Sequence, residues 1–314
     1  MIERCAQPGT MVSPTVTVAI ACYNQALYLG EAIESILAQT RPVDEIIMVD
    51  DGSRDATGLV TALYPTVTYH RQDNGGLSAA RNTGLRLAST SHILFLDADD
   101  ILMPTAIADA LDAFARRPGI AFAYGGYREV TATRELIFER LAVEHEDAFA
   151  GLLHDNHVSM HGTVLYDVEP LRAISGFDTS LPSCEDYDVY LKLVRDRPIA
   201  AYAGVGADYR RHGANMSSNA PRMIQTGRRV IERQIEAGGL TPAQRTAARQ
   251  GIEFNTRFYS LQMIAELKRA LIRPFWLIAT GWRNDARFPI RLIGATFHTL
   301  AWKLRLTRND PDDL

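Results

Sequence analysis

Three carboxylates stand close together in the sequence, at Asp97, Asp99 and Asp100, directly after the apolar run His92–Leu96. Carboxylate oxygens two residues apart suit a hard divalent cation that also binds the oxygens of a diphosphate. A solvated turn or a helix N-cap would account for the same residues. The cluster alone therefore leaves a metal site and a structural turn both open.

Two other apolar runs also end in polar, turn-forming residues. Asp50-Asp51-Gly52-Ser53 follows the run Ile46–Val49, and Tyr23-Asn24 follows the run Val16–Cys22. Each pattern alone is a common turn. In an open α/β sheet, however, ligands bind beyond the carboxyl ends of the strands. Three such ends meeting at one edge are what a nucleotide pocket requires.

The elements that must position these residues alternate between two patterns. Short apolar runs predict strands, and apolar residues at helical spacing predict helices between them. This alternation indicates βαβ units and a mostly parallel sheet. The predicted strands are Val16–Cys22, Ile46–Val49, Val67–Tyr69 and His92–Leu96, and the predicted helices are Leu27–Ala38, Asp55–Leu63 and Ser78–Ala88.

The rest of the chain is less regular. One further helix is predicted at Glu185–Arg195, and from about Pro221 the pattern is helical and rich in Arg, Ala and Leu. Asp188, within the predicted helix Glu185–Arg195, is expected to face solvent. Further strands are predicted at Ala121–Tyr124, Thr163–Tyr166 and Ala207–Arg210.

Composition describes an ordinary globular protein. The 314 residues are 46% hydrophobic and 22% charged, which fits one large domain with an appendage. The three cysteines are widely separated, so they support no disulfide framework and fit a reducing cytosol. The N-terminus has no signal-like region, and no apolar run approaches the roughly 20 residues of a membrane span. We therefore expect neither a cleavable signal nor a segment that crosses a bilayer.

Charge is divided unevenly along the chain. Residues 1–220 hold 17 Lys and Arg against 29 Asp and Glu, and residues 221–314 hold 16 against 8. An acidic front repels nucleic acid and argues against a polynucleotide substrate. Within the tail, Lys268–Arg308 has nine bases, one acid and several aromatic residues. Such helices can lie on an anionic membrane or pack against the preceding domain or a partner subunit, and both interpretations stay open.

Six ordered stretches resemble glycosyltransferase family two, of the GT-A fold. They are VTVAIACYN, DEIIMVDDGSRDAT, QDNGGLSAARNTGL, HILFLDADDILMP, GFDTSLPSCEDYDVYLKL and YRRHGANMS. The resemblance implies a GT-A α/β catalytic domain over residues 1–220 and a helical C-terminal extension over 221–314. It implies an inverting transfer from a nucleotide sugar, a UDP-sugar above all, to a hydroxyl of a glycan or a lipid-linked acceptor. We expect a cytoplasmic protein, peripheral at the inner membrane face if the tail binds lipid.

The same resemblance implies roles around the donor. Asp51 is similar to the carboxylate that reads the base, and Cys22, Tyr23 and Asn24 would flank that base. Arg81 resembles a basic residue near the base or the phosphates.

Asp97, Ala98 and Asp99 match the family's Asp-x-Asp motif. The first aspartate would lie near the ribose and the second on Mn²⁺ or Mg²⁺. His212 matches a histidine that faces the metal or the diphosphate. Asp186 matches the catalytic base, although an acid in the first turn of a helix also has a purely structural explanation.

Three alternatives need separate weighing. A sugar nucleotidyltransferase has a similar fold, but its first strand is followed by a glycine-rich loop, and here the residues are Ile20-Ala21-Cys22-Tyr23-Asn24. A non-catalytic nucleotide-binding or partner-binding protein is disfavoured by the intact aspartates and His212. His154, His157 and His161 have helical spacing, but no cysteine or carboxylate joins them convincingly in a zinc site.

Overall fold

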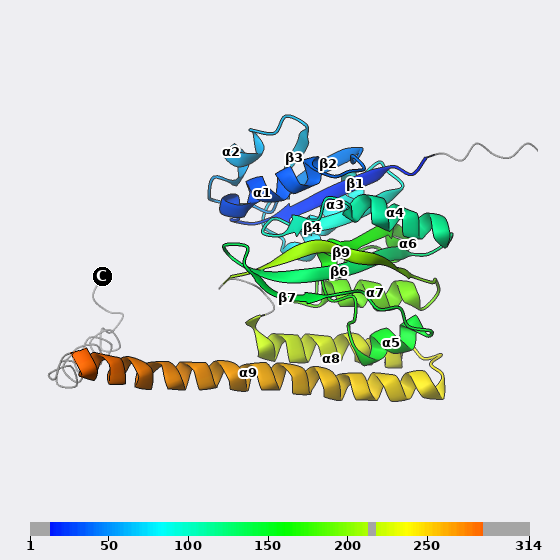
Figure 1. Ribbon diagram of the computed structural model, residues 1–314. Coiled ribbons are helices and arrows are strands. Elements are labelled where there is room, and N and C mark those ends of the chain that lie inside the picture. Colours follow the sequence, from blue (N-terminus) through cyan, green and yellow to red (C-terminus); the bar gives the residue numbers. More distant parts are fainter. Residues whose placement is uncertain (1–12, 213–217, 285–314) are drawn as a thin grey trace, which may run out of the picture. The chain divides into compact units, whose positions relative to one another are not determined.

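The computed structural model describes residues 13–212 and 218–284, with side chains to residue 265 (Figure 1). Within these residues nine strands form one mixed sheet in the order β3-β2-β1-β4-β8-β6-β9-β5, and β7 pairs with β6. The strands are β1 (Val16–Cys22), β2 (Glu45–Asp50), β3 (Val67–Arg71), β4 (His92–Asp97), β5 (Ile101–Leu102), β6 (Phe122–Thr131), β7 (Leu136–Arg140), β8 (Val164–Asp167) and β9 (Ala200–Arg211).

The first four strands run parallel, as the sequence predicts. Every residue of β1 is buried, which is typical of a parallel strand covered on both faces. The predicted βαβ alternation is confirmed, and each boundary falls within two residues of its expected place. The connecting helices are α1 (Ala26–Leu37), α2 (Thr57–Thr61) and α3 (Leu77–Leu87).

The register of these strands brings their polar ends to one edge. Cys22 pairs with Asp50 across β1 and β2, and Ala21 pairs with Asp97 across β1 and β4. The polar residues that follow β1, β2 and β4 therefore begin at the same level of the sheet. This is the edge at which the sequence predicts a nucleotide pocket.

The second half of the sheet departs from the prediction. β8 runs antiparallel to both β4 and β6, and β6 runs parallel to β9. Strand β9 begins seven residues before the predicted Ala207, because Gly204 and Gly206 interrupt the apolar pattern. The elements absent from the prediction are β5, β7, α4 (Ala106–Arg116), α5 (Ala148–His154) and α6 (Val168–Ala173).

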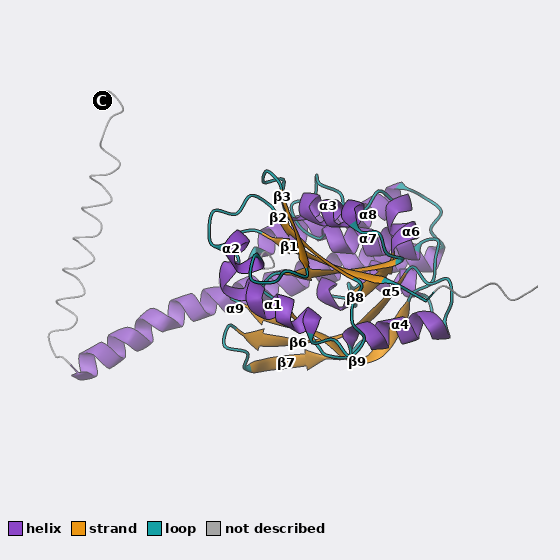
Figure 2. Ribbon diagram, turned by 90° about the horizontal axis from the view of Figure 1, so that it is seen from above, coloured by secondary structure: helices purple, strands orange, loops and turns teal. Residues whose placement is uncertain are grey.

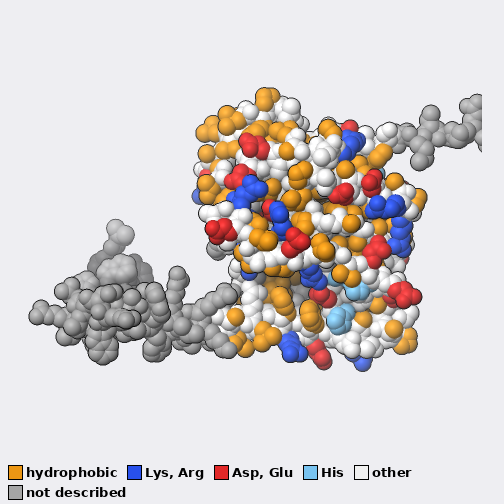
Figure 3. Space-filling view, viewed as in Figure 1, with side chains coloured by type: hydrophobic (Ala, Val, Ile, Leu, Met, Phe, Trp, Pro, Cys, Tyr) orange, Lys and Arg blue, Asp and Glu red, His pale blue; other side chains and the backbone are white. Residues whose placement is uncertain are grey.

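Helices cover both faces of the sheet (Figure 2). Two apolar clusters fill the space between the helices and the sheet. Successive strand residues alternate between them, so Ala19 faces one cluster while Val18 and Ile20 face the other. Helices α3, α5, α6 and α7 (Glu185–Val194) contribute to the first cluster, and α1 and α4 to the second. On the surface in Figure 3, acidic and basic side chains are interspersed over the sheet domain.

Helix α7 is held by a buried carboxylate. Asp188 is fully buried, so the expectation that it faces solvent is wrong. Its carboxylate pairs with Lys192 Nζ at 2.6 Å and with Arg233 Nη1 at 3.5 Å. Arg233 belongs to α8 (Ala220–Glu236) and also pairs with Asp178 at 2.7 Å. The side chain of Arg233 comes from a helix distant in sequence, so helical periodicity could not reveal that Asp188 is paired and buried.

The C-terminal helices begin within the unit that carries the sheet. The chain divides into compact units of residues 1–257 and 258–314, so α8 and the start of α9 (Pro242–Asn284) belong to the first. Val230 and Ile231 of α8 pack in its core. The domain boundary at residue 220 stays a prediction. Among the described residues, no helix is long and apolar enough to cross a membrane.

The contact of α9 with α5 generates a test. A Cβ on Gly251 would clash with the main-chain oxygen of Leu153 and lie 3.0 Å from that of His154. Gly251→Ala should therefore lower the free energy of unfolding by about 1–3 kcal/mol, although alanine is the better helix former by about 1 kcal/mol. Chemical denaturation followed by circular dichroism measures the change.

The matched control is Gly30→Ala in α1. Its Cβ would meet only the hydroxyl of Tyr64, at 3.3 Å, which is the end of a side chain that can move. This variant should be at least as stable as the wild type. Equal stability of the two variants would contradict the close approach of α9 to α5.

Candidate functional site

The ends of β1 and β2 are joined by a network of hydrogen bonds. Asp51 N donates to Cys22 O at 2.9 Å, and Asn24 N donates to Ser53 Oγ at 2.9 Å. Asn24 adopts a left-handed conformation, with φ of 54°, and its side chain accepts from Arg54 N at 2.8 Å. The predicted base-flanking residues thus form one fixed corner. Tyr23 stands there with 48% of its surface exposed.

Asp51 lies at this corner but holds a loop. Asp51 is 3% exposed, and its carboxylate accepts from Gln72 Nε2 at 2.7 Å, Gly75 N at 2.9 Å and Gly76 N at 2.8 Å. Gly76 has φ of 86°, a conformation that favours glycine. Asp51 therefore fixes residues 72–76 beside the predicted base pocket. Its role as base reader stays a prediction.

Arg81 joins the end of β4 to the start of α7. It lies on α3 with 2% of its side chain exposed, and it donates to Asp97 Oδ1 at 2.8 Å and Glu185 Oε1 at 2.6 Å. Burial alone would lower the pKa of Arg81, but the two carboxylates raise it, so the guanidinium stays charged. The sequence assigns Arg81 to the base or phosphates. Its contacts in the structure are with these two acids.

Asp186 follows Glu185 in the first turn of α7. Cys184 precedes the helix in a left-handed conformation, with φ of 57°, and Asp186 Oδ1 accepts from Tyr187 N at 2.7 Å. Burial, together with the charge of Glu185, raises the pKa of Asp186 to about 7. A carboxyl that titrates near neutral pH is suited to proton transfer. Its neighbour Glu185 is linked through Arg81 to Asp97 of the Asp-x-Asp motif.

Asp99 and His212 meet at the end of β9. His212 Nε2 lies 2.7 Å from Asp99 Oδ2, and both side chains are partly exposed, at 11% and 14%. Ala98 between the two aspartates is buried. Burial, with the charge of Asp97, raises the pKa of Asp99. An oxygen and an imidazole nitrogen side by side, among carboxylates that repel each other, fit a divalent cation.

Asp99 and His212 are two of the ligands that a divalent cation would need. In the part of the chain that the structure describes, no group of three or more His, Cys, Asp or Glu is arranged to hold a metal ion. A Mg²⁺ ion bound here would take its other ligands from phosphate oxygens and water, as is typical of nucleotide sites.

Sequence reasoning missed the residues that hold this pair in place. Asp100 is buried and accepts from Arg210 N at 3.0 Å, while Arg210 Nε donates to the main-chain oxygen of Asp99 at 3.0 Å. Tyr28 stacks on His212 with ring centroids 5.3 Å apart. Arg210 and His212 are two residues apart at the end of one strand, and this alternation is the signal that could have found Arg210.

The three histidines weighed for zinc make separate contacts. His161 Nε2 lies 2.9 Å from Tyr166 Oη inside the core, and His154 contacts Phe254. His157 packs against His145, with ring centroids 4.2 Å apart, and burial lowers the pKa of His157 to about 4. Each of the three histidines thus packs against a different residue.

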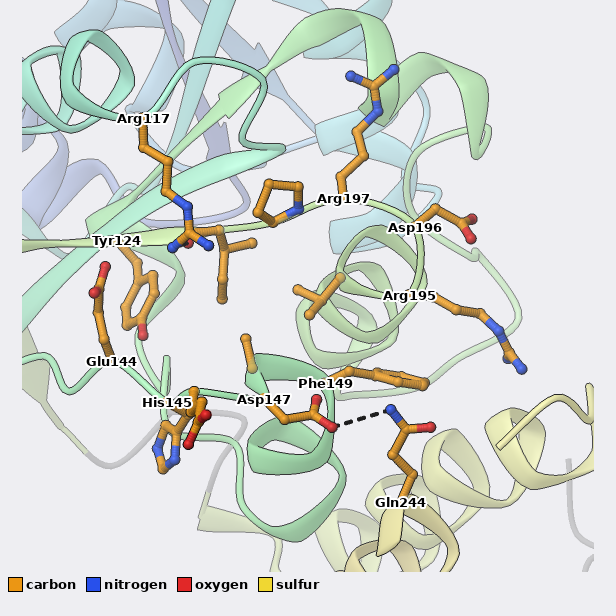
Figure 4. Close-up of a pocket in the computed structure, with 15 residues that line it drawn as sticks. Arg117, Tyr124, Glu144, His145, Asp147, Phe149, Arg195, Asp196, Arg197 and Gln244 are labelled. Carbon is orange, nitrogen blue, oxygen red and sulfur yellow. Dashed lines mark hydrogen bonds between the residues drawn. The ribbon is translucent and has the colours of Figure 1, made fainter. Parts of the chain in front are cut away.

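A pocket of about 390 Å³ is lined by none of Asp97, Asp99 and Asp100. Figure 4 shows the side chains that line it. It is lined by residues that precede β9, by the start of α5 and by Tyr124 near the beginning of β6. Phe122 of β6 and Ile93 of β4 both pair with Tyr166, so the beginnings of β6 and β4 lie at the same end of the sheet. Because Tyr124 lies near the beginning of β6 and Asp97 at the end of β4, the pocket is near the end of the sheet opposite to Asp97. Its lining contains three arginines and four acids.

Comparison with known proteins adds to this geometry. The model for glycosyl transferase family 2 matches residues 17–174. An uncharacterized glycosyltransferase of Rickettsia typhi is 30% identical over 222 residues, 68% of this chain and 69% of that protein. The chondroitin synthase of Escherichia coli is 30% identical over 210 residues, 65% of this chain and 30% of the synthase. The chain spans about a third of the length of this synthase and of a Rickettsia felis glycosyltransferase that it also matches.

Solved structures share the fold. The mannosyltransferase PcManGT from Pyrobaculum calidifontis, in complex with GDP-Man and Mn²⁺, aligns with a TM-score of 0.60 at 19% identity, covering 94% of this chain and 89% of that one. Residues 1–349 of S. aureus TarS, in complex with UDP-GlcNAc, align with a TM-score of 0.62 at 18% identity, covering 76% and 71%. Because the family model covers half of the chain and these enzymes share its sheet, the protein belongs to glycosyl transferase family 2 and has the GT-A fold.

Proposed function

We propose that this protein is a metal-dependent, inverting glycosyltransferase that moves a sugar from a UDP-sugar to an acceptor hydroxyl. The observation that carries the proposal is the bridge of Arg81, which contacts Asp97 of the Asp-x-Asp motif at 2.8 Å and Glu185, the neighbour of Asp186, at 2.6 Å. Because Arg81 joins these two acids, it supports the proposal that the donor site at Asp97 and the base Asp186 belong to one active site. Membership of the family argues against a sugar nucleotidyltransferase.

The donor would bind along the ends of β1, β2 and β4. Cys22, Tyr23 and Asn24 would flank the base, and Asp51 would read it. Asp97 and Ala98 would contact the ribose. The complex of TarS with UDP-GlcNAc supports a uridine donor, and the complex of PcManGT with GDP-Man leaves a guanosine donor as the alternative.

Asp99 and His212 would hold Mn²⁺ or Mg²⁺. Such a cation, when bound, neutralises the charge that develops on a departing nucleoside diphosphate. The complex of PcManGT with Mn²⁺ supports this choice of cation. Arg210 keeps the main chain of Asp99 in place through a hydrogen bond of 3.0 Å.

Asp186 would act as the general base. It would take the proton of the acceptor hydroxyl as the oxygen attacks the anomeric carbon on the side opposite to the leaving diphosphate. One such displacement inverts the anomeric centre. It requires no second carboxylate as a nucleophile, so a single base at the start of α7 suffices.

The acceptor would be a glycan or a lipid-linked glycan in surface polysaccharide or glycoconjugate assembly. The basic and aromatic segment Lys268–Arg308 supports contact with an anionic membrane surface, and equally with a second subunit. Its side chains lie outside the described residues. We place the reaction in the cytoplasm, at the inner face of the membrane if the tail binds lipid.

The first test concerns the metal. Asp99→Ala removes one ligand, so it should abolish turnover and remove the part of the UDP affinity that depends on Mn²⁺. Isothermal titration of UDP with and without Mn²⁺ measures this part. The matched control is Asp112→Ala on the exposed side of α4, which should behave as wild type. If Asp99→Ala keeps the full Mn²⁺ dependence, Asp99 is not a ligand.

The second test concerns the base. Because its pKa is raised to about 7, Asp186 is protonated below that pH and cannot accept a proton. Transfer should therefore rise as the pH increases through about 7 and level off above it. Asp186→Asn should lower transfer by roughly 10²–10⁴-fold, remove this rise and leave the UDP affinity near wild type.

The matched control for the base is Asp196→Asn, in the exposed loop after α7. It should keep both the rate and the pH profile. Near-normal transfer by Asp186→Asn would mean that another group is the base.

The third test concerns the tail. If the tail lies on a membrane, the full chain should sediment with anionic liposomes at low salt and be released by added salt, because each exposed Lys or Arg contributes about 1 kcal/mol there. Replacing Arg287, Arg291, Lys303 and Arg305 with Gln should abolish sedimentation and keep UDP binding. A wild type that ignores anionic liposomes at low salt would contradict membrane contact and favour a subunit interface.

A further inference from the structure

The ring of Tyr28 contacts His212 and Arg210, two residues that both contact Asp99. Tyr28 stands in the first turn of α1, where its N–H donates to Gln25 O at 3.0 Å. Its ring stacks on the imidazole of His212, with centroids 5.3 Å apart and planes 22° from parallel. The guanidinium carbon of Arg210 lies 4.7 Å from the centre of the same ring. A helix next to β1 thus supports the end of β9.

Arg210 is held on all sides. Its side chain is 3% exposed, Nε donates to Asp99 O, Nη1 donates to Ala132 O at 3.0 Å, and Nη2 donates to Glu31 Oε2 at 2.9 Å. Its main-chain N–H donates to Asp100 Oδ1 at 3.0 Å. A planar guanidinium with donors used in three directions has little freedom to rotate. It therefore fixes the main chain of Asp99 against β9.

The imidazole of His212 receives two different contacts. Its Nε2 lies 2.7 Å from Asp99 Oδ2, which fixes one point of the ring. The stacked ring of Tyr28 acts on the plane of the imidazole. Metal-binding histidines generally depend on such supporting contacts for their orientation.

We propose that Tyr28 is a positioning residue, whose ring holds the plane of His212 so that the imidazole and Asp99 together present ligands to the divalent cation. Arg210 completes the arrangement by fixing the Asp99 main chain and packing on the same ring. This inference rests on the proposed metal-dependent function. Tyr28 itself does not ligate the metal, because its contact is made through the ring face.

The test measures metal binding directly. Mn²⁺ is titrated into the full chain in the presence of saturating UDP, and free Mn²⁺ is followed by electron paramagnetic resonance. Tyr28→Leu keeps an apolar side chain but lacks a ring face, so it should weaken Mn²⁺ binding by about 10–100-fold, the effect typical of lost support behind a ligand. Tyr28→Phe keeps the ring and should bind Mn²⁺ as the wild type does. UDP affinity without metal should be equal in all three proteins.

The matched control is Tyr64→Leu, which removes another tyrosine that packs against α1, through a hydrogen bond to Glu34 of 3.1 Å. It should leave Mn²⁺ binding unchanged. Normal Mn²⁺ binding by Tyr28→Leu would overturn the inference. So would an equal loss in Tyr28→Phe, which would assign the effect to the hydroxyl, or an equal loss of metal-free UDP binding, which would assign it to the nucleotide. A wild type that binds no Mn²⁺ with UDP would instead overturn the metal dependence itself.

Discussion

The buried guanidinium of Arg81 is the constraint on which the site depends. A fully buried cation is stable only with opposite charges against it, and Arg81 takes them from Asp97 at the end of β4 and Glu185 at the start of α7. Glu185 is 104 residues away in sequence. The triad therefore fixes the start of α7, and with it Asp186, against the end of β4. Loss of Arg81 would leave the buried carboxylate of Glu185 without its cation, so this junction depends on the guanidinium.

The same region collects negative charge at a cost in stability. Burial and mutual repulsion raise the pKa of both Asp99 and Asp100, and Asp186 is raised by burial and by Glu185. Within the described residues Arg81 and Arg210 are the buried cations among these acids, and both use their donors to hold position. A cation delivered with the diphosphate would relieve the remaining repulsion. An acidic corner of this kind is expected where function rather than stability sets the residues.

The sequence predicts the parallel half of the sheet because each strand there is a short apolar run buried on both faces, such as β1. It also brings the polar strand ends to one edge, because carboxyl ends of parallel strands must meet. The contacts within the site do not follow in this way. Asp188 is predicted to face solvent because its pairing with Arg233 of α8 leaves no trace near it in the sequence, and no pattern around Arg81 predicts its contacts with two acids. Ion pairs between distant segments carry no local pattern.

The missed strand β5 shows why the contacts around Asp99 and His212 do not follow from local sequence patterns. It is two residues long, too short for any alternation to be recognised, and it follows Asp100 directly. Its antiparallel pairing sets Ile101 opposite Asp208 and Leu102 opposite Ala207. Since β5 runs on from the aspartates and β9 runs on toward His212, this pairing turns Asp99 back onto a residue 113 positions away. Beyond the paired residues, Arg210 N donates to the side-chain oxygen Oδ1 of Asp100 at 3.0 Å. The contact between Asp99 and His212 is therefore a product of register between two strands, and one residue of slip would turn the imidazole to the opposite face.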